Sequence, residues 1–229
     1  MSEVAPAGLA RRLEPVFDAL ARHYGPQRWW PARHSFEMIA GALLVQNTAW
    51  TNAQRALDNL TAAGSLSIEG ILRLDELALQ ELVRPSGYYR QKAAKLRSFA
   101  EHVRDEHGGE LTALLGLPME DLRRELLSIW GVGAETADSI ILYAAHQPSF
   151  VVDGYTVRVL SRIGLIDDRT SRRLLRAWLM EAIAPDPRRY AEYHALLVRH
   201  GKALCRKTPN CPECPLLGMC RYGGGVVLR

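Results

Sequence analysis

The chain has 229 residues, 48% of them hydrophobic and 24% charged, a composition typical of globular proteins that excludes an intrinsically disordered chain. A formal charge of +4 and an isoelectric point near 9.0 are compatible with a polyanionic partner. No segment approaches the roughly 18–20 apolar residues of a membrane span, and the N-terminal segment lacks the apolar core of a signal peptide. We therefore expect a cytoplasmic protein without a membrane partner.

Apolar residues recur at intervals of three and four along most of the chain, which predicts a succession of amphipathic helices. Ser35 and Asp75 are expected to cap two of these helices. A strand-like pattern is confined to residues 150–152, so the predicted fold is all-α. The predicted helices cover residues 8–24, 35–48, 50–62, 67–73, 75–84, 88–106, 119–129, 136–145, 170–183 and 188–204.

Two short clusters interrupt this regular pattern. Trp29 and Trp30 lie in a predicted loop, where large aromatic side chains either plug a core or stack on an unpaired base. The triplet Gln46, Asn47 and Thr48 ends an otherwise apolar helix, and amides in such a place need hydrogen-bond partners. Both clusters are therefore candidate functional residues.

A glycine turn and a lone carboxylate follow each other in the segment 129–158. Gly131, Val132 and Gly133 join two predicted helices, and glycines at the start of a helix leave backbone N–H groups open to a phosphate oxygen. About twenty residues later comes Asp153. A purely structural turn and a helix-capping aspartate are the simpler alternatives.

All four cysteines of the chain lie near its C-terminus, with five, two and five residues between them. In a reducing compartment such a group favours a metal site over disulfides. Four thiolates suit tetrahedral zinc and a [4Fe-4S] cluster alike. The candidate ligands are Cys205, Cys211, Cys214 and Cys220.

Together these motifs resemble the helix-hairpin-helix DNA glycosylases of the endonuclease III type. LSIWGVGAETADSIILYA is similar to the hairpin of that family, FVVDGYTVRV to its aspartate-bearing segment, and the cysteine group to its iron–sulfur loop. WWPARHSFEMIAGALLVQNTAW with GAETADSI is most similar to the endonuclease III-related branch that includes 3-methyladenine DNA glycosylases. The resemblance implies a monomer that binds double-stranded DNA containing a damaged base and is nucleoid-associated while bound.

The family's architecture implies two helical lobes in this chain. Residues 33–146 would form a six-helix barrel domain that carries the hairpin motif. Residues 1–32 and 147–229 would form a second, discontinuous helical lobe. Its loop 205–220 would hold a [4Fe-4S] cluster, with zinc as the alternative.

The resemblance also implies roles for matching residues. Asp153 would be the catalytic carboxylate, acting on a base flipped out of the duplex. Gln46 would fill the gap left by that base, with Asn47 as a neighbouring DNA contact. Gly131, Val132 and Gly133 would hold a phosphate, with the help of a bound cation.

Trp29, Trp30 and Trp50 match the walls of the family's base pocket. Aromatic walls suit a cationic alkylated purine because cation–π attraction contributes roughly 0.5–2 kcal/mol. Such a base is also a good leaving group. The predicted substrate is therefore an alkylated purine such as 3-methyladenine, which Asp153 and water would release.

Two positions depart from the endonuclease III pattern. Glu135 occupies the place of the lysine that forms a Schiff base in that enzyme, and a carboxylate cannot do so. The sequence therefore predicts a monofunctional glycosylase without efficient lyase activity. The first cysteine interval has five residues in place of the family's usual six. Lys202, just before the cysteines, is expected at the surface.

Two other functions are compatible with the same motifs. One is a glycosylase for oxidised pyrimidines or for uracil and thymine mismatches, whose pocket would read the Watson–Crick edge with amide groups. The other is a catalytically silent protein that binds DNA structures through the hairpin alone. Release of free base from defined lesions distinguishes all three.

Overall fold

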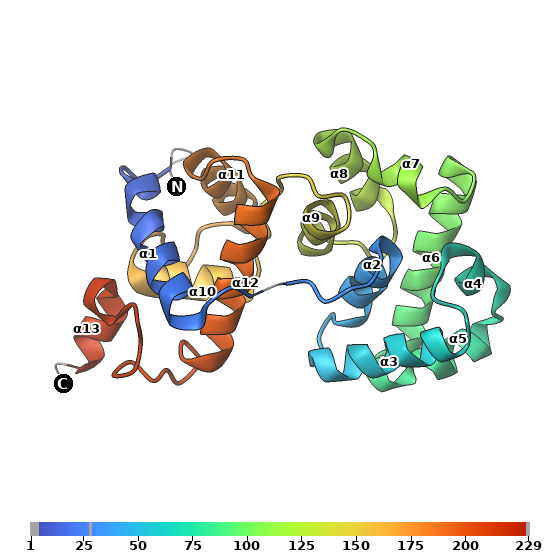
Figure 1. Ribbon diagram of the computed structural model, residues 1–229, viewed down its shortest axis with the longest axis horizontal. Coiled ribbons are helices and arrows are strands. Elements are labelled where there is room, and N and C mark those ends of the chain that lie inside the picture. Colours follow the sequence, from blue (N-terminus) through green and yellow to red (C-terminus); the bar gives the residue numbers. More distant parts are fainter. Residues whose placement is uncertain (1–4, 28, 228–229) are drawn as a thin grey trace. The chain divides into compact units, whose positions relative to one another are not determined.

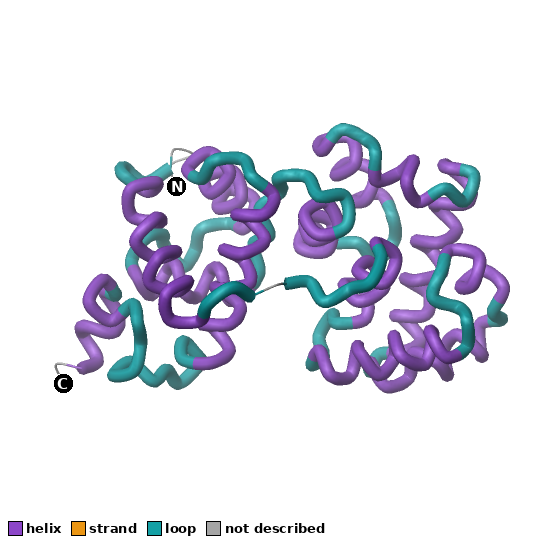
Figure 2. The backbone as a smooth tube through the Cα atoms, viewed as in Figure 1, coloured by secondary structure: helices purple, strands orange, loops and turns teal. Residues whose placement is uncertain are grey.

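The computed structural model describes residues 5–27 and 29–227. Within these residues the chain forms helices and loops and no strand (Figure 2), which confirms the all-α prediction. Residues 150–152 form a buried segment without regular structure rather than a strand. None of the described helices is both long and apolar enough to cross a membrane.

The chain divides into two compact units. The split unit contains the described residues up to Trp29 and those from Pro148 onward, and the continuous unit runs from Trp30 to Gln147. The helices of the split unit are α1 (Leu9–Tyr24), α10 (Gly154–Ile163), α11 (Arg172–Ala182), α12 (Pro187–Ala203), η2 (Leu217–Met219) and α13 (Arg221–Val227). Those of the continuous unit are α2 (Ser35–Leu44), α3 (Trp50–Ala62), α4 (Ile68–Arg73), α5 (Glu76–Val83), η1 (Arg84–Ser86), α6 (Tyr89–His107), α7 (Leu111–Leu115), α8 (Met119–Ser128) and α9 (Ala134–Tyr143).

Helix α2 is the buried centre of the continuous unit. Every residue from Phe36 to Leu44 is buried, and the helix packs on α3, α6 and α9. A helix that is apolar on all sides has to be surrounded in this way. The end of α2 is consequently fixed in place, and the residues that follow it are held beside α9.

A buried lysine closes the C-terminal end of α2. Lys92 is 2% exposed, and its ammonium donates to the carbonyl oxygens of Leu44 at 2.8 Å and Ser86 at 2.5 Å. Burial lowers the pKa of Lys92 to about 8. These bonds satisfy a helix-end carbonyl that has no partner within its own helix.

In the split unit, α12 packs against both α1 and α10 (Figure 1). Tyr190 and Tyr193 of α12 are fully buried and stack edge-on against Phe150. The hydroxyl of Tyr193 donates to the carbonyl of Leu13 in α1 at 2.9 Å. The long helix thus holds together the two parts of the unit that are separated in sequence.

Side-chain caps begin several helices, and one of the two caps predicted from the sequence is confirmed. Asp75 accepts from the backbone N–H of Ala78 at 2.7 Å. The predicted cap Ser35 is wrong, because Ser35 is the first helical residue and the His34 ring accepts from Glu37 N. The predicted ranges also omit α7, α10 and α13, of which α7 and α13 have only five and seven residues and are too short for a clear period.

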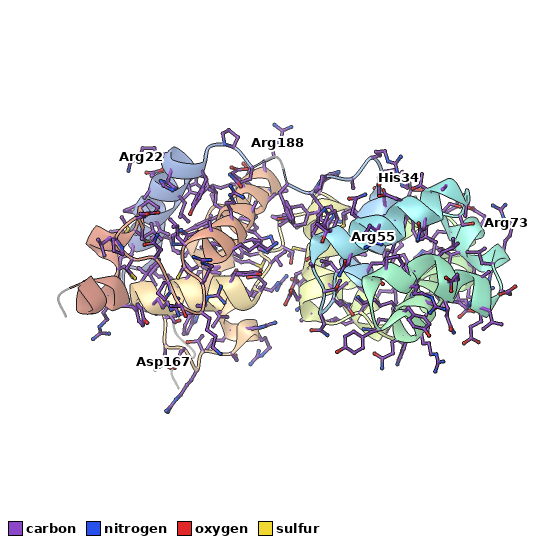
Figure 3. The ribbon with its side chains drawn as sticks, turned by 90° about the horizontal axis from the view of Figure 1, so that it is seen from below. Arg22, His34, Arg55, Arg73, Asp167 and Arg188 are labelled. Carbon is purple, nitrogen blue, oxygen red and sulfur yellow. The ribbon has the colours of Figure 1, made fainter. Side chains whose placement is uncertain are left out.

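Both units carry arginines that reach solvent. Arg22 and Arg188 of the split unit and Arg55 and Arg73 of the continuous unit are exposed (Figure 3). The formal charge is nevertheless divided unevenly, because the split unit has 18 Lys and Arg against 10 Asp and Glu, and the continuous unit has 11 against 15. The positive excess, which permits long-range attraction of a polyanion, therefore belongs to the split unit.

Candidate functional site

The glycine turn lies beside a surface cavity of about 480 Å³ in the continuous unit. The turn joins α8 to α9, as predicted for a helix–hairpin–helix motif. The cavity brings the predicted DNA-contacting residues together and adds Lys95 and Thr136 to them. Its lining is Gln46, Asn47, Lys95, Gly131, Val132, Gly133, Glu135 and Thr136.

Gly131 is required at the turn for two reasons. Its φ of +89° lies in a region that favours glycine. In addition, a Cβ at this position would meet Cγ of Lys95 at 2.3 Å, so the stem of that lysine lies directly against the turn. The hairpin is therefore packed against a side chain from α6, a helix outside the motif.

Gly131→Ala is expected to destabilise the protein by about 1–3 kcal/mol because a side chain would be forced into a strained backbone conformation and a contact. Gly133→Ala is the matched control, since φ there is −91° and a Cβ would meet no atom within 4 Å. Thermal or denaturant unfolding measures both effects. Adding Lys95→Ala to Gly131→Ala should recover the part of the lost stability that the contact with Lys95 causes. Equal unfolding midpoints for Gly131→Ala and Gly133→Ala would contradict this account.

Gln46 ties the end of α2 to the hairpin. Its amide nitrogen donates to the carbonyl of Gly131 at 3.2 Å and to the hydroxyl of Thr136 at 3.1 Å. Its amide oxygen accepts from the Lys95 ammonium. Asn47 follows with φ of +54°, which asparagine tolerates better than most residues. Within the polar triplet, Gln46 thus has the partners that its position demands, and the Thr48 hydroxyl accepts from the Asn52 amide at 3.1 Å.

Glu135 lies in the first turn of α9 and is exposed. A carboxylate is favoured there by the helix dipole. Trp130, in the hairpin itself, is 57% exposed. A large aromatic side chain displayed in a turn is unusual, and the sequence analysis did not identify it as a candidate.

The three predicted pocket tryptophans fall into two groups. Trp30 stacks edge-on against Trp50, with ring centroids 5.3 Å apart, and is tilted against Tyr143 at 5.6 Å. Trp30, Trp50 and Tyr143 belong to the continuous unit. Trp29 belongs to the split unit, where the Lys202 ammonium lies 6.0 Å from its ring centroid and 5.8 Å from that of Tyr155. Lys202 is exposed, as expected.

Asp153 is the N-cap of α10 and is only 7% exposed. Its Oδ1 accepts from the backbone N–H of Thr156 at 2.7 Å and from the Thr156 hydroxyl at 2.9 Å. The capping alternative raised by the sequence is therefore correct as far as Oδ1 is concerned. The second carboxylate oxygen, Oδ2, faces His194, whose Nε2 lies 3.6 Å away.

His194 is a buried residue of α12 that the sequence analysis did not identify. Burial alone would raise the pKa of Asp153, but the nearby His194 imidazole and the Thr156 donors outweigh it and hold that pKa below its ordinary value. Asp153 is consequently ionised at neutral pH. A histidine in an amphipathic helix gives no sequence signal of such a pairing.

All four cysteines line one cavity in the split unit and none forms a disulfide. Donors point at the sulfurs: the Arg162 guanidinium lies 3.4 Å from Cys205 Sγ, and the N–H of Gly223 lies 3.3 Å from Cys220 Sγ. Burial and neighbouring thiolates raise the pKa of the Cys211 thiol. A bound cation would offset the unfavourable burial and mutual repulsion of the thiolates. The donor set therefore fits a four-thiolate metal centre.

Two arginines of α10 hold the chain that leads into the cysteine loop. Arg158 donates to the carbonyls of Cys205 at 2.8 Å and Gly201 at 2.9 Å. Arg162 donates to the carbonyl of Arg206 at 2.6 Å. Since Asp153 caps α10, the carboxylate and the cysteine loop are braced by the same helix.

The chain matches the family described as "HhH-GPD superfamily base excision DNA repair protein" over residues 40–185. That range includes the hairpin and Asp153. "Putative DNA repair glycosylase MJ1434" of Methanocaldococcus jannaschii is 42% identical over 206 residues, which cover 90% of this chain and 94% of that protein.

Two solved structures have the same fold. One is a non-covalent endonuclease III–DNA complex, with a TM-score of 0.83 and 23% identity over 96% of this chain and 99% of the other. The second is the H. pylori 3-methyladenine DNA glycosylase bound to 1,N6-ethenoadenine. Its TM-score is 0.70, with 26% identity over 85% of this chain and 97% of the other.

Proposed function

Because the chain belongs to the HhH-GPD superfamily of base excision DNA repair proteins, we propose that it is a monofunctional DNA glycosylase that removes an alkylated purine from double-stranded DNA. The observation that carries this proposal is the buried carboxylate of Asp153, whose Oδ1 accepts the capping bonds of Thr156 while Oδ2 faces His194. A carboxylate with one oxygen turned away from its capping bonds can act on a sugar that becomes positive during bond cleavage.

Asp153 would act on the sugar of a base flipped out of the duplex. As the bond between C1′ and the base breaks, the bonding electrons leave with the base, and a cationic alkylated purine departs as a neutral molecule. The carboxylate stabilises the oxocarbenium character at C1′ and accepts a proton from the attacking water. The water oxygen then forms the new bond to C1′. His194 would keep the carboxylate oriented and ionised.

The hairpin cavity would hold the DNA backbone. The first N–H groups of α9 point away from their helix and suit a phosphate oxygen, and Lys95 in the cavity adds a positive charge. Gln46 would insert where the flipped nucleotide has left the stack, with Asn47 beside it. The endonuclease III structure of the same fold contains DNA, and the H. pylori structure contains a modified base.

The base preference rests on the aromatic residues. Trp30 and Trp50, which pack edge-on and are partly exposed, would attract a cationic ring by about 0.5–2 kcal/mol through an aromatic face. The Lys202 ammonium already lies near the Trp29 ring, and its positive charge would repel a cationic base. Trp29 would therefore attract such a base less strongly. The walls for a cationic purine are therefore assigned chiefly to Trp30 and Trp50.

The cysteine loop would hold a [4Fe-4S] cluster through Cys205, Cys211, Cys214 and Cys220. Four thiolates around one cavity, with arginine and backbone donors aimed at the sulfurs, support this assignment. When bound, the cluster would cross-link the C-terminal loop. No step of base removal passes through it.

Purified protein is expected to release free base from duplexes with N3- or N7-methylated purines faster than from duplexes with uracil, thymine glycol or T:G pairs. The cation–π contribution alone corresponds to about 2- to 30-fold in rate. Strands should remain uncut until alkali is added, and borohydride should trap no protein on DNA, because Glu135 cannot form a Schiff base.

Glu135→Lys serves as the positive control for trapping. Faster release of an oxidised or mismatched pyrimidine would replace the alkylpurine assignment, and no release from any duplex would favour a silent DNA-binding protein. Trapping of the wild type that disappears in Lys95→Gln would assign a lyase role to the lysine in the cavity and contradict the monofunctional proposal.

A further inference from the structure

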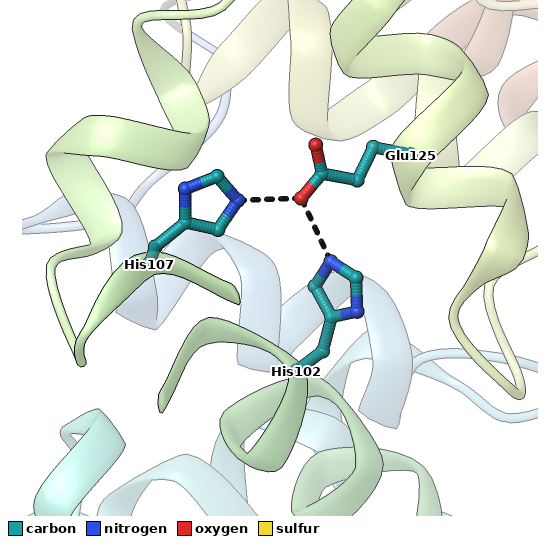
Figure 4. A group of neighbouring side chains, drawn as sticks. All are labelled: His102, His107 and Glu125. Carbon is teal, nitrogen blue, oxygen red and sulfur yellow. Dashed lines mark hydrogen bonds and ion pairs between the residues drawn. The ribbon is translucent and has the colours of Figure 1, made fainter. Parts of the chain in front are cut away.

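A second group of metal-ligating side chains lies in the continuous unit, apart from the cysteines. His102 and His107 of α6 and Glu125 of α8 converge on one point (Figure 4). Nε2 of His102 lies 2.8 Å and Nε2 of His107 2.5 Å from the same oxygen of Glu125. The three potential ligand atoms all lie within 4.8 Å of one another.

The surroundings of this group suit an ion bound near the surface. The side chains are 19%, 13% and 25% exposed for His102, His107 and Glu125. They are therefore sheltered but accessible from solvent. Both rings present the nitrogen at the far end of the imidazole, a common donor to metals.

The donor set and its dimensions fit zinc. Zinc binds imidazole nitrogen and carboxylate oxygen at about 2.0–2.2 Å, which places tetrahedral ligands about 3.3–3.5 Å apart. The two nitrogen–oxygen separations need to lengthen by about 1 Å or less, which small rotations of three side chains provide. Two histidines and one carboxylate leave a fourth position for water.

We propose that His102, His107 and Glu125 form a Zn²⁺ site that joins the end of α6 to α8. The two glycines that reverse the chain after His107, Gly108 and Gly109, have φ of +59° and +88°. The link therefore spans a turn that only glycine adopts easily. Since α8 is the first helix of the hairpin motif, the ion would fix the motif against the long helix that also supplies Lys95. The site does not depend on the proposed glycosylase activity.

Equilibrium dialysis against buffered Zn²⁺, followed by elemental analysis for zinc and iron, tests the proposal on the full chain. The variants are His102→Asn and Glu125→Gln, and the matched control is His146→Asn. His146 is exposed, and its φ of +54° is one that asparagine tolerates. Metal held by the cysteines is common to all four proteins, so the difference reports the new site.

The wild type and His146→Asn should bind one zinc ion more per chain than the two site variants. Zinc affinity of the site should fall by at least about 100-fold, because even the loss of an outer partner costs 10–100-fold. Zinc should also raise the thermal midpoint of the wild type but not of Glu125→Gln, which can still accept hydrogen bonds from both histidines. Equal zinc content and equal midpoint shifts in all four proteins would overturn the proposal.

Discussion

Asp153→Asn is expected to lower the rate of base release by about 10²–10⁴-fold while the fold persists. The carboxylate supplies the negative charge and the proton acceptor in the proposed reaction, and the amide supplies neither. Asparagine caps helices about as well as aspartate, so the bonds to Thr156 should survive. Single-turnover release of methylated purine, measured beside DNA binding and circular dichroism, separates the loss of chemistry from a loss of structure.

Asp186→Asn is the matched control. Asp186 is also an N-cap in the split unit, where it accepts from Arg188 N at 2.9 Å, but it is exposed. The Asp186→Asn variant should release base at the wild-type rate. Unchanged release by Asp153→Asn would remove the catalytic assignment and leave Asp153 as a cap alone.

The stability of the wild type and that of Asp153→Asn should differ in their dependence on pH. Because the pKa of Asp153 is depressed by folding, its charge adds to the free energy of unfolding above the unfolded-state pKa of about 3.9. That contribution is lost as the pH falls through the lower, folded-state pKa. The stability difference between wild type and Asp153→Asn should therefore change as the pH falls from about 5 through the folded-state pKa of Asp153.

Cys211→Ser is expected to abolish stoichiometric iron binding and to weaken the split unit. Cys211 is the buried member of the four cysteines, and a serine hydroxyl is a poor substitute for a thiolate ligand. A loss of about 2–3 kcal/mol would lower the thermal midpoint by roughly 5–10 °C for a chain of this size. Elemental analysis, the visible absorbance of the cluster and thermal unfolding measure the three consequences.

Glu213→Ser is the control for this loop, since Glu213 is an exposed neighbour of Cys214. The Glu213→Ser variant should retain its iron and the thermal unfolding midpoint of the wild type. A wild-type protein that contains zinc and no iron would replace the cluster assignment by the zinc alternative. Normal iron content in Cys211→Ser would exclude Cys211 as a ligand.

The sequence predicts the helices well where the apolar periodicity is long, as at α3, α6 and α12. It cannot anticipate that Lys92 caps α2 from a distance of 48 residues, because that contact exists only after packing. Nor does it separate Trp29 from Trp30, adjacent residues that belong to different units.

In the candidate site, too, features set by local sequence can be predicted and those set by tertiary packing cannot. A turn residue such as Gly131 can be identified from the sequence because its φ of +89° is a local backbone conformation that favours glycine. Lys95 and His194 cannot, since they reach Gly131 and Asp153 from other helices. Their relevance comes from tertiary contacts that no local pattern records.

The stem of Lys95 against Gly131 limits how far the hairpin can be treated as a portable module. A fragment consisting of α8, the turn and α9 would lack the side chain that the glycine accommodates and the amide of Gln46 that holds its carbonyl. Transplanting those two helices onto another scaffold would transfer the sequence motif without the shape of its turn. The smallest transferable part includes the end of α2 and the middle of α6.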